Sequence, residues 1–205
     1  GQPVDISSPT KANQLGIGMV HQHFMLVDAF TVTENIILGS EPKKNGMLDK
    51  KKAKAEIVRL SEEYGLKVDP DAYIRDISVG MQQRVEILKT LYRGANVLIF
   101  DEPTAVLTPQ EIDELITIME GLINEGKSII LITHKLDEIK KVADRCSVIR
   151  RGQYIGTVDV KDVSSQQLAD MMVGRSVSFK TDKVPATPGE VVLSIKNLVV
   201  KESRG

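Results

Sequence analysis

The chain has 205 residues, of which 41% are apolar, and its 27 basic side chains nearly balance 28 acidic ones. This balance excludes the strong overall charge that draws a protein to nucleic acid or to an anionic membrane surface. The longest apolar runs fall far short of the about 20 residues that a membrane-spanning helix needs, and the single Cys146 excludes an internal disulfide. Because the first residues show neither an initiator Met nor a signal segment, the numbering is expected to begin inside a longer protein.

A strand is predicted at residues 16–21, and a helical region without a strand pattern follows it. Helices are predicted at 51–64, where Asp49 is a candidate N-cap, and at 81–91. These periods indicate that residues 24–94 form an inserted helical subdomain.

Two runs of branched apolar residues, 97–100 and 128–132, are typical of parallel strands buried on both faces. A helical stripe at 109–124 lies between them. This pattern predicts a β-α-β unit with neighbouring central strands.

A second β-α-β unit is predicted from a helix at 135–143 and a strand at 146–150. Arg151 and Gly152 then turn the chain into a further strand at 153–158. The fold class is therefore α/β.

The predicted organisation has an α/β core at residues 1–23 and 95–174, interrupted by the helical subdomain. Residues 175–190 have linker composition, with Pro and Gly among small residues. A strand at 191–200 is expected to begin another domain, of which residues 191–205 are the start.

Two adjacent carboxylates, Asp101 and Glu102, follow the apolar run at 97–100. Ligands of open α/β sheets bind at the carboxyl ends of the strands. An Asp at that place can hold Mg²⁺, largely through water, and the following Glu can orient or deprotonate a water that attacks a γ-phosphate. An ordinary strand and turn is the alternative for this pattern on its own.

Further polar residues lie where they can join these carboxylates. Ser78 and Gly80 begin a helix, where free amides and the dipole favour an anion, although a plain N-cap role for Ser78 is the alternative. His134 ends the second core strand at the same sheet edge, and Gln22 follows the first strand. Taken singly, His134 or Gln22 would more often be structural.

In this order, the motifs resemble those of an ABC ATPase. They are the Q-loop (Gln22), the signature (Ser78-Val79-Gly80), Walker B with its catalytic Glu (Asp101-Glu102) and the switch His (His134). Residues 19–27, 77–84 and 104–109 are similar to the first cassette of tandem sugar and nucleoside importer ATPases, most of all to the nucleoside, guanosine-type branch. In that family, segments like 172–175 and 192–198 close the first cassette and open the second.

The resemblance implies a set of site residues and two ligands, ATP and Mg²⁺. The implied roles are catalytic for Glu102, His134 and Gln22, metal-binding for Asp101 and Gln22, and nucleotide-binding for Ser78, Gly80 and Gln82. In the family, Ser78 and Gly80 would serve the nucleotide of the second cassette of the same chain. Thr108 stands where many ABC proteins have an Asp, so the two sites are expected to communicate asymmetrically.

The resemblance also implies partners. Contact with integral membrane permease subunits is assigned to Phe24, Met25, Leu26 and Phe30, with burial in the subdomain core as the alternative. The protein would be peripheral on the cytoplasmic face of the cell membrane and would energise uptake of nucleosides or related sugars. An extracellular substrate-binding lipoprotein would be an indirect partner, and nucleic acid would not be one. A soluble ABC ATPase of translation or DNA repair is the alternative.

The phosphate-binding loop, G-x-x-x-x-G-K-S/T, is absent from the sequence. The resemblance implies that this Walker A loop and its strand precede the first residue in the sequence. It also implies that this strand lies in the middle of the sheet. The expected fold is thus a P-loop NTPase core with a gap in its sheet, and the chain by itself is expected not to hydrolyse ATP.

Overall fold

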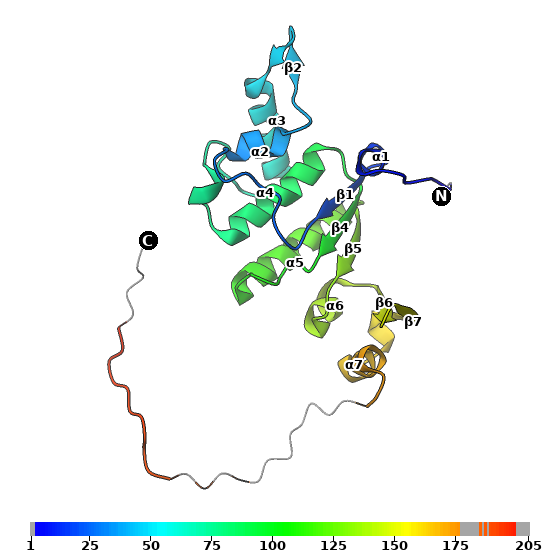
Figure 1. The fold of residues 1–205 in the computed structure, drawn as a ribbon, viewed down its shortest axis with the longest axis vertical. Coiled ribbons are helices and arrows are strands. Elements are labelled where there is room, and N and C mark those ends of the chain that lie inside the picture. The colour runs from blue at the N-terminus through cyan, green and yellow to red at the C-terminus, as the bar shows by residue number, and fades with distance from the viewer. Residues whose placement is uncertain (1–2, 177–184, 186, 188, 200–205) are drawn as a thin grey trace.

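The computed structural model describes residues 3–176, 185, 187 and 189–199. Figure 1 shows a parallel sheet at the centre, a group of helices on one side of it, and a hairpin with a helix at the other end. The chain begins with helix α1 (Pro9–Gln14), which no sequence pattern had indicated and which Ser8 caps.

The central sheet has three parallel strands in the order β1-β4-β5. They are β1 (Ile17–Val20), β4 (Val97–Asp101) and β5 (Ser128–Ile132). Leu98 and Phe100 of the middle strand, β4, are fully buried. The prediction that the two apolar runs form neighbouring parallel strands is confirmed.

Helix α5 (Pro109–Asn124) joins β4 to β5 over the predicted residues. Thr108 caps it and forms a capping box with Glu111, which fixes where the helix begins. Leu115 and Met119 are buried on its inner face, so the helical stripe read from the sequence is the face that covers the sheet.

The second β-α-β unit was predicted wrongly. Helix α6 (Leu136–Val142) does connect β5 to β6 (Arg145–Arg150), but β6 pairs antiparallel with β7 (Gln153–Asp159) in a separate two-stranded sheet. In the described part of the chain, the outer edge of β5 has no strand partner, and Ile130 and Ile132 are exposed there.

Helix α7 (Ser165–Val173) follows the 3-10 helix η2 (Val160–Asp162) and packs against β6. Arg150 of β6 donates a hydrogen bond to the Met171 carbonyl at 2.8 Å. A small cluster of buried apolar side chains, which includes Leu168, stabilises this end of the molecule.

Between β1 and β4 the chain forms the group of helices at the top of Figure 1. They are α2 (Val32–Ile37), α3 (Lys50–Glu63), η1 (Ile74–Asp76) and α4 (Val79–Tyr92). Asp49 accepts a hydrogen bond from the Lys52 amide at 3.0 Å, which confirms its predicted role as the N-cap of α3.

A short hairpin corrects the prediction that residues 24–94 contain no strands. In it, β2 (Lys43–Lys44) pairs with β3 (Met47–Leu48). The turn residues Asn45 and Gly46 have φ values of 52° and 82°, the conformation that Asn-Gly favours in two-residue hairpin loops. Strands this short show no alternation pattern.

One continuous hydrophobic core joins the helical region to the sheet. Its fully buried members include Ile36, Ile57 and Ile87 from the helices and Leu98 and Phe100 from β4. Because these side chains share one core, the packing fixes α4 relative to the central strand.

Residues 191–199 are exposed and form no strand, so the strand predicted there was wrong for the described residues. An isolated extended segment has no neighbouring strand to satisfy its backbone groups. Most of the expected linker lies outside the described residues. No helix within residues 3–176, 185, 187 and 189–199 is long and apolar enough to cross a membrane.

We expect Ile87→Ala to lower the free energy of unfolding by about 2–5 kcal/mol, the usual cost of deleting buried methyl groups and leaving a cavity. Ile123→Ala is the matched control: Ile123 is also helical, in α5, but 38% exposed. It should cost less than about 1 kcal/mol. Chemical denaturation measures both values, and equal losses would contradict the importance of the shared core.

Candidate active site

The carboxyl ends of the parallel strands bring Glu102 and His134 together. Past the last paired residues of β4 and β5, the Glu102 amide donates to the Ile132 carbonyl at 2.9 Å. This hydrogen bond places Glu102 beside the residues that follow β5, and its Oε1 lies 3.1 Å from Nδ1 of His134. The predicted carboxylate and imidazole are therefore neighbours in space.

The backbone of Glu102 has a positive φ of 43°. For a residue other than Gly this conformation costs about 1–3 kcal/mol and is concentrated at active sites. The side chains of Glu102 and His134 are 33% and 65% exposed. The strained turn thus presents both groups to a ligand from solvent.

Asp101 and Gln22 lie at the same sheet edge. Asp101 is half-buried at the end of β4, and Gln22 is exposed two residues beyond the end of β1. Neither side chain has a hydrogen-bond partner within the described part of the chain. The structure therefore places them near the carboxylate edge without joining them to the Glu102–His134 pair.

The residues at this edge fit Mg²⁺ better than a metal held by a protein cage. Within the described residues, no group of three or more His, Cys, Asp or Glu side chains could hold a metal ion. Mg²⁺ keeps several waters and binds through one or two carboxylates together with substrate phosphates. One carboxylate, that of Asp101, meets this requirement.

A buried carboxylate that the sequence reasoning missed connects the two halves of the candidate site. Glu138 of α6 accepts hydrogen bonds from the hydroxyl of Thr104 and, at 2.9 Å, from that of Thr133. Lys135 Nζ donates to the Thr104 carbonyl at 3.0 Å and lies 3.5 Å from Glu138. This network ties the turn after Glu102 to the residues on either side of His134.

Helix α4 is also tied to that turn. The buried Gln83 donates a hydrogen bond to the Pro103 carbonyl at 2.9 Å. Its neighbour Gln82, a predicted nucleotide contact, instead donates to the carbonyls of Ile74 and Ile77, each at 3.4 Å. The Gln82 amide is therefore used within the helical region in this structure.

The start of α4 carries the other predicted nucleotide contacts. The Ser78 hydroxyl accepts from the Met81 amide at 3.3 Å, so Ser78 is an N-cap in this structure. The carboxylate of Glu111 lies beside Gly80, since a Cβ at Gly80 would lie 2.3 Å from Glu111 Oε1. An anionic group of the chain itself thus lies where a phosphate was predicted.

Glu111 is held as a carboxylate by Thr108. The Thr108 amide donates to its Oε2 at 2.9 Å, and the hydroxyl of Thr108 does so at the same distance. These contacts, with a smaller contribution from the Gly80 amide, lower the pKa of Glu111. The negative charge beside the start of α4 is therefore held in place by Thr108, in the turn that precedes α5.

The four predicted partner contacts differ in exposure. The side chain of Met25 is 65% exposed and that of Phe30 is 38% exposed. Phe24 is half-buried, and Leu26 packs against the main core. Leu26 thus matches the alternative of burial in the core, and the permease contact stays a prediction for the exposed residues.

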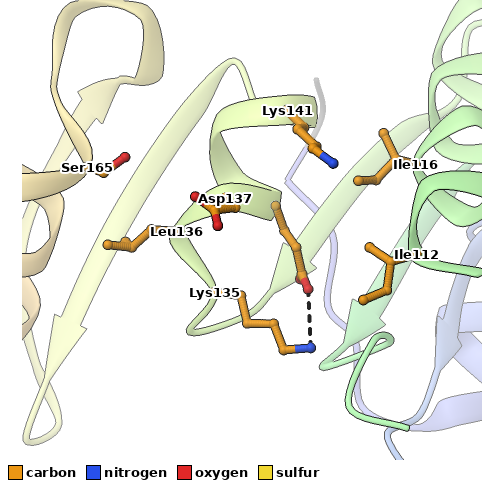
Figure 2. Close-up of a pocket in the computed structure, with 8 residues that line it drawn as sticks. Ile112, Ile116, Lys135, Leu136, Asp137, Lys141 and Ser165 are labelled. Atoms are coloured by element: carbon orange, nitrogen blue, oxygen red, sulfur yellow. Dashed lines mark ion pairs between the residues drawn. The ribbon is translucent and has the colours of Figure 1, made fainter. Parts of the chain in front are cut away.

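A separate groove lies elsewhere on the molecule. Figure 2 shows it between α5 and α6, with Ile112 and Ile116 on one wall and Lys135, Asp137 and Lys141 on the other. Its volume is about 600 Å³, and no predicted site residue lines it. We therefore place the candidate site at the strand ends and not in this groove.

The parallel sheet with a carboxylate and an imidazole at its edge, interrupted by helices, is the architecture of an ATP-binding cassette. A family profile described as ABC transporter matches residues 1–105, half of the chain. The chain therefore belongs to the ABC transporter family.

The full chain is 70% identical over 205 residues to the nucleoside import ATP-binding protein NupA of Lactococcus lactis subsp. cremoris. It is 64% identical over the same length to the guanosine import ATP-binding protein NupO of Bacillus subtilis. In each case the match covers 100% of this chain, and this chain spans 40% of the length of the relative.

Solved structures agree with the fold. The chain is similar to cbiO1 of Clostridium perfringens, part of the ABC transporter complex cbiONQ, with a TM-score of 0.65, 26% identity, and coverage of 84% of this chain and 67% of that one. It also resembles the dimeric ATP-binding cassette MJ0796 bound to ADP and Pi, with a TM-score of 0.61, 20% identity, and coverage of 76% and 68%. The predicted fold class and family resemblance are confirmed.

Glu138→Ala should lower the free energy of unfolding by about 1–3 kcal/mol, because it leaves the hydroxyls of Thr104 and Thr133 without their buried acceptor. Asp137→Ala is the control, since Asp137 is the preceding carboxylate in the same helix turn and is exposed. It should cost at most about 1 kcal/mol through the helix dipole. Thermal or chemical unfolding distinguishes them, and a Glu138 variant as stable as the Asp137 variant would contradict the network.

Proposed function

We propose that the chain is part of the ATP-hydrolysing subunit of an importer for nucleosides or related sugars. The main support is the Glu102–His134 pair, held by a strained turn at the carboxyl edge of a parallel sheet. The printed functions of the two relatives, nucleoside and guanosine import, support the substrate class. Because the chain spans 40% of these relatives, the activity is proposed for the whole protein.

In the proposed reaction, Glu102 orients and deprotonates the water that attacks the γ-phosphate. His134 contacts a γ-phosphate oxygen, and Gln22 would help to hold the metal ion. Asp101 holds Mg²⁺, which neutralises phosphate charge when bound. This chemistry needs a carboxylate and an imidazole that can both contact the γ-phosphate. The 3.1 Å distance between Glu102 Oε1 and His134 Nδ1 supports this assignment.

The nucleotide contacts at the start of α4 are proposed to act across the two cassettes. Ser78 and Gly80 present helix N-terminal amides, which favour an anion. The second cassette of the same chain would supply the bound ATP. The Glu111 carboxylate beside Gly80 supports this role, because it is an anionic group at the same helix start.

We place the protein at the cytoplasmic face of the cell membrane, bound to integral membrane permease subunits and only indirectly linked to an extracellular substrate-binding lipoprotein. The exposed Met25 and Phe30 side chains support a contact with an apolar partner. The alternative, a soluble ABC ATPase of translation or DNA repair, is not favoured, because the relatives compared are importers. We propose no nucleic-acid partner, since the charge is balanced.

In the full-length protein, Glu102→Gln should preserve ATP binding and reduce the steady-state turnover number by ~10² or more, the scale of a lost general base. Glu120→Gln, an exposed Glu on α5, is the control and should leave turnover unchanged. Single-turnover hydrolysis measured at the first cassette isolates the effect. A Glu102→Gln protein with the wild-type rate there would refute the role of Glu102 as base.

Replacing both Phe24 and Phe30 with Ser in the complete transporter should weaken permease binding by about 2 kcal/mol or more, as for aromatic anchors at interfaces, and should uncouple ATP hydrolysis from uptake. Met47→Ser is the control, since Met47 is 73% exposed on the hairpin of the same helical region. Uptake and ATP turnover are measured together in proteoliposomes. Normal assembly and transport by the double variant would exclude this contact.

A further inference from the structure

Helix α4 holds the backbone of Met25 at both of its polar groups. The Met25 amide donates to Glu86 Oε1 at 2.8 Å, and Lys89 Nζ donates to the Met25 carbonyl at 2.9 Å. Lys89 Nζ also lies 3.6 Å from Glu86 Oε1. We call this arrangement of Glu86, Lys89 and the Met25 backbone the Met25 clamp.

The two charged side chains of the Met25 clamp are largely buried. The side chains of Glu86 and Lys89 are 4% and 13% exposed. An apolar pair would serve packing equally well, because buried ion pairs are often no more stable than apolar residues of the same volume. Hydrogen bonds that involve an ionised group are, however, stronger and more directional than neutral ones. The clamp therefore fixes the path of the chain at Met25 more than it adds to the core.

Because the clamp binds only backbone atoms, it leaves the Met25 side chain free to face solvent. A second contact holds the chain two residues further on, where Asn35 of α2 accepts from the Val27 amide at 2.7 Å and donates to the Val27 carbonyl at 3.1 Å. The exposed apolar segment is thus attached to two helices by hydrogen bonds, and the Met25 clamp provides those to α4.

The other groups on α4 connect this helix to both nucleotide sites. Its first turn carries Ser78 and Gly80, and Gln83 binds the turn after Glu102. Glu86 and Lys89 follow on the same helix. A displacement of Met25 would therefore be transmitted to α4 through hydrogen bonds and not through a flexible loop.

We propose that Glu86 and Lys89 are positioning residues that couple the partner-binding segment at Met25 to helix α4, so that binding of the membrane subunit and the orientation of Ser78 and Gly80 depend on each other. This inference rests on the proposed function, in which Met25 and Phe30 contact a permease subunit. It assigns the coupling to two side chains that touch neither the nucleotide nor the partner.

The test uses the full-length protein assembled with its membrane subunits. Glu86→Gln weakens the acceptor of the Met25 amide, and Lys89→Met removes the donor that holds the Met25 carbonyl. Each should accelerate amide hydrogen exchange at Met25 by about tenfold to a hundredfold, the loss expected for one charge-assisted hydrogen bond. They should also reduce the stimulation of ATP turnover by transported substrate, while turnover without substrate is retained. Lys89→Arg keeps a cationic donor and should restore most of the stimulation.

Glu56→Gln is the matched control. Glu56 forms an ion pair with Arg59 at the same spacing, three residues apart on a helix, but that pair is exposed and binds no backbone group of another segment among the described residues. Its variant should behave as the wild type in both measurements. This comparison separates the clamp from a general effect of removing a helical charge.

The outcomes distinguish the inference from the proposed function. If the Phe24 and Phe30 double variant abolishes transport while Glu86→Gln and Lys89→Met keep full stimulation, the coupling role is overturned and the docking proposal stands. If stimulation falls without faster exchange at Met25, the clamp is likewise overturned. If the double Phe variant transports normally, the docking proposal fails, and this inference fails with it.

Discussion

The parallel register between β4 and β5 is the constraint on which the candidate site depends. Asp101 is paired with Ile132, and the Glu102 amide continues the ladder by one more hydrogen bond to the same residue. A shift of one residue would turn every side chain of a strand to the other face. Burial of Leu98 and Phe100 prevents such a shift, and the approach of Glu102 to His134 follows from it.

Helix α4 gives the structure its second level of organisation. It shares one apolar core with the sheet, and its polar side chains reach segments that are distant in sequence. Gln83 binds the turn after β4, and the Glu86–Lys89 pair binds the chain after β1. The inserted helices are thus joined to both neighbouring strand ends by directed hydrogen bonds in addition to apolar packing.

The sequence was sufficient for features that depend on local pattern. The centre of the fold was predicted from the consecutive apolar residues of β4 and β5 and from the apolar stripe of α5. Burying these residues leaves few alternative arrangements of the strands and the helix. The order of the motifs predicted which side chains gather at the sheet edge. Helix α2 was missed although Thr31 and Glu34 form a capping box at its start, a signal that a search for helix starts would have found.

Other features depend on tertiary neighbours, and no local pattern encodes them. The turn at Arg151 and Gly152 predicted that β7 follows β6, but whether β6 also joins the central sheet is decided by which strands lie beside it. The positive φ of Glu102 and the burial of Glu138 between two turns likewise arise only when distant segments meet. Gln82 matched a motif, yet its amide found carbonyl partners within its own helical region.

Because Gly80 and Glu111 lie in contact, the choice of amino acid at one position limits the choice at the other. Gly80 is a helical residue without a positive φ, and a methyl group there would overlap the Glu111 carboxylate unless the Glu111 side chain moved. A shorter residue at position 111 would remove the overlap, but it would also remove the capping box at the start of α5. Substitutions at the start of the signature helix are therefore limited by the chain beyond Walker B, and the two positions should change together among sequences that keep this fold.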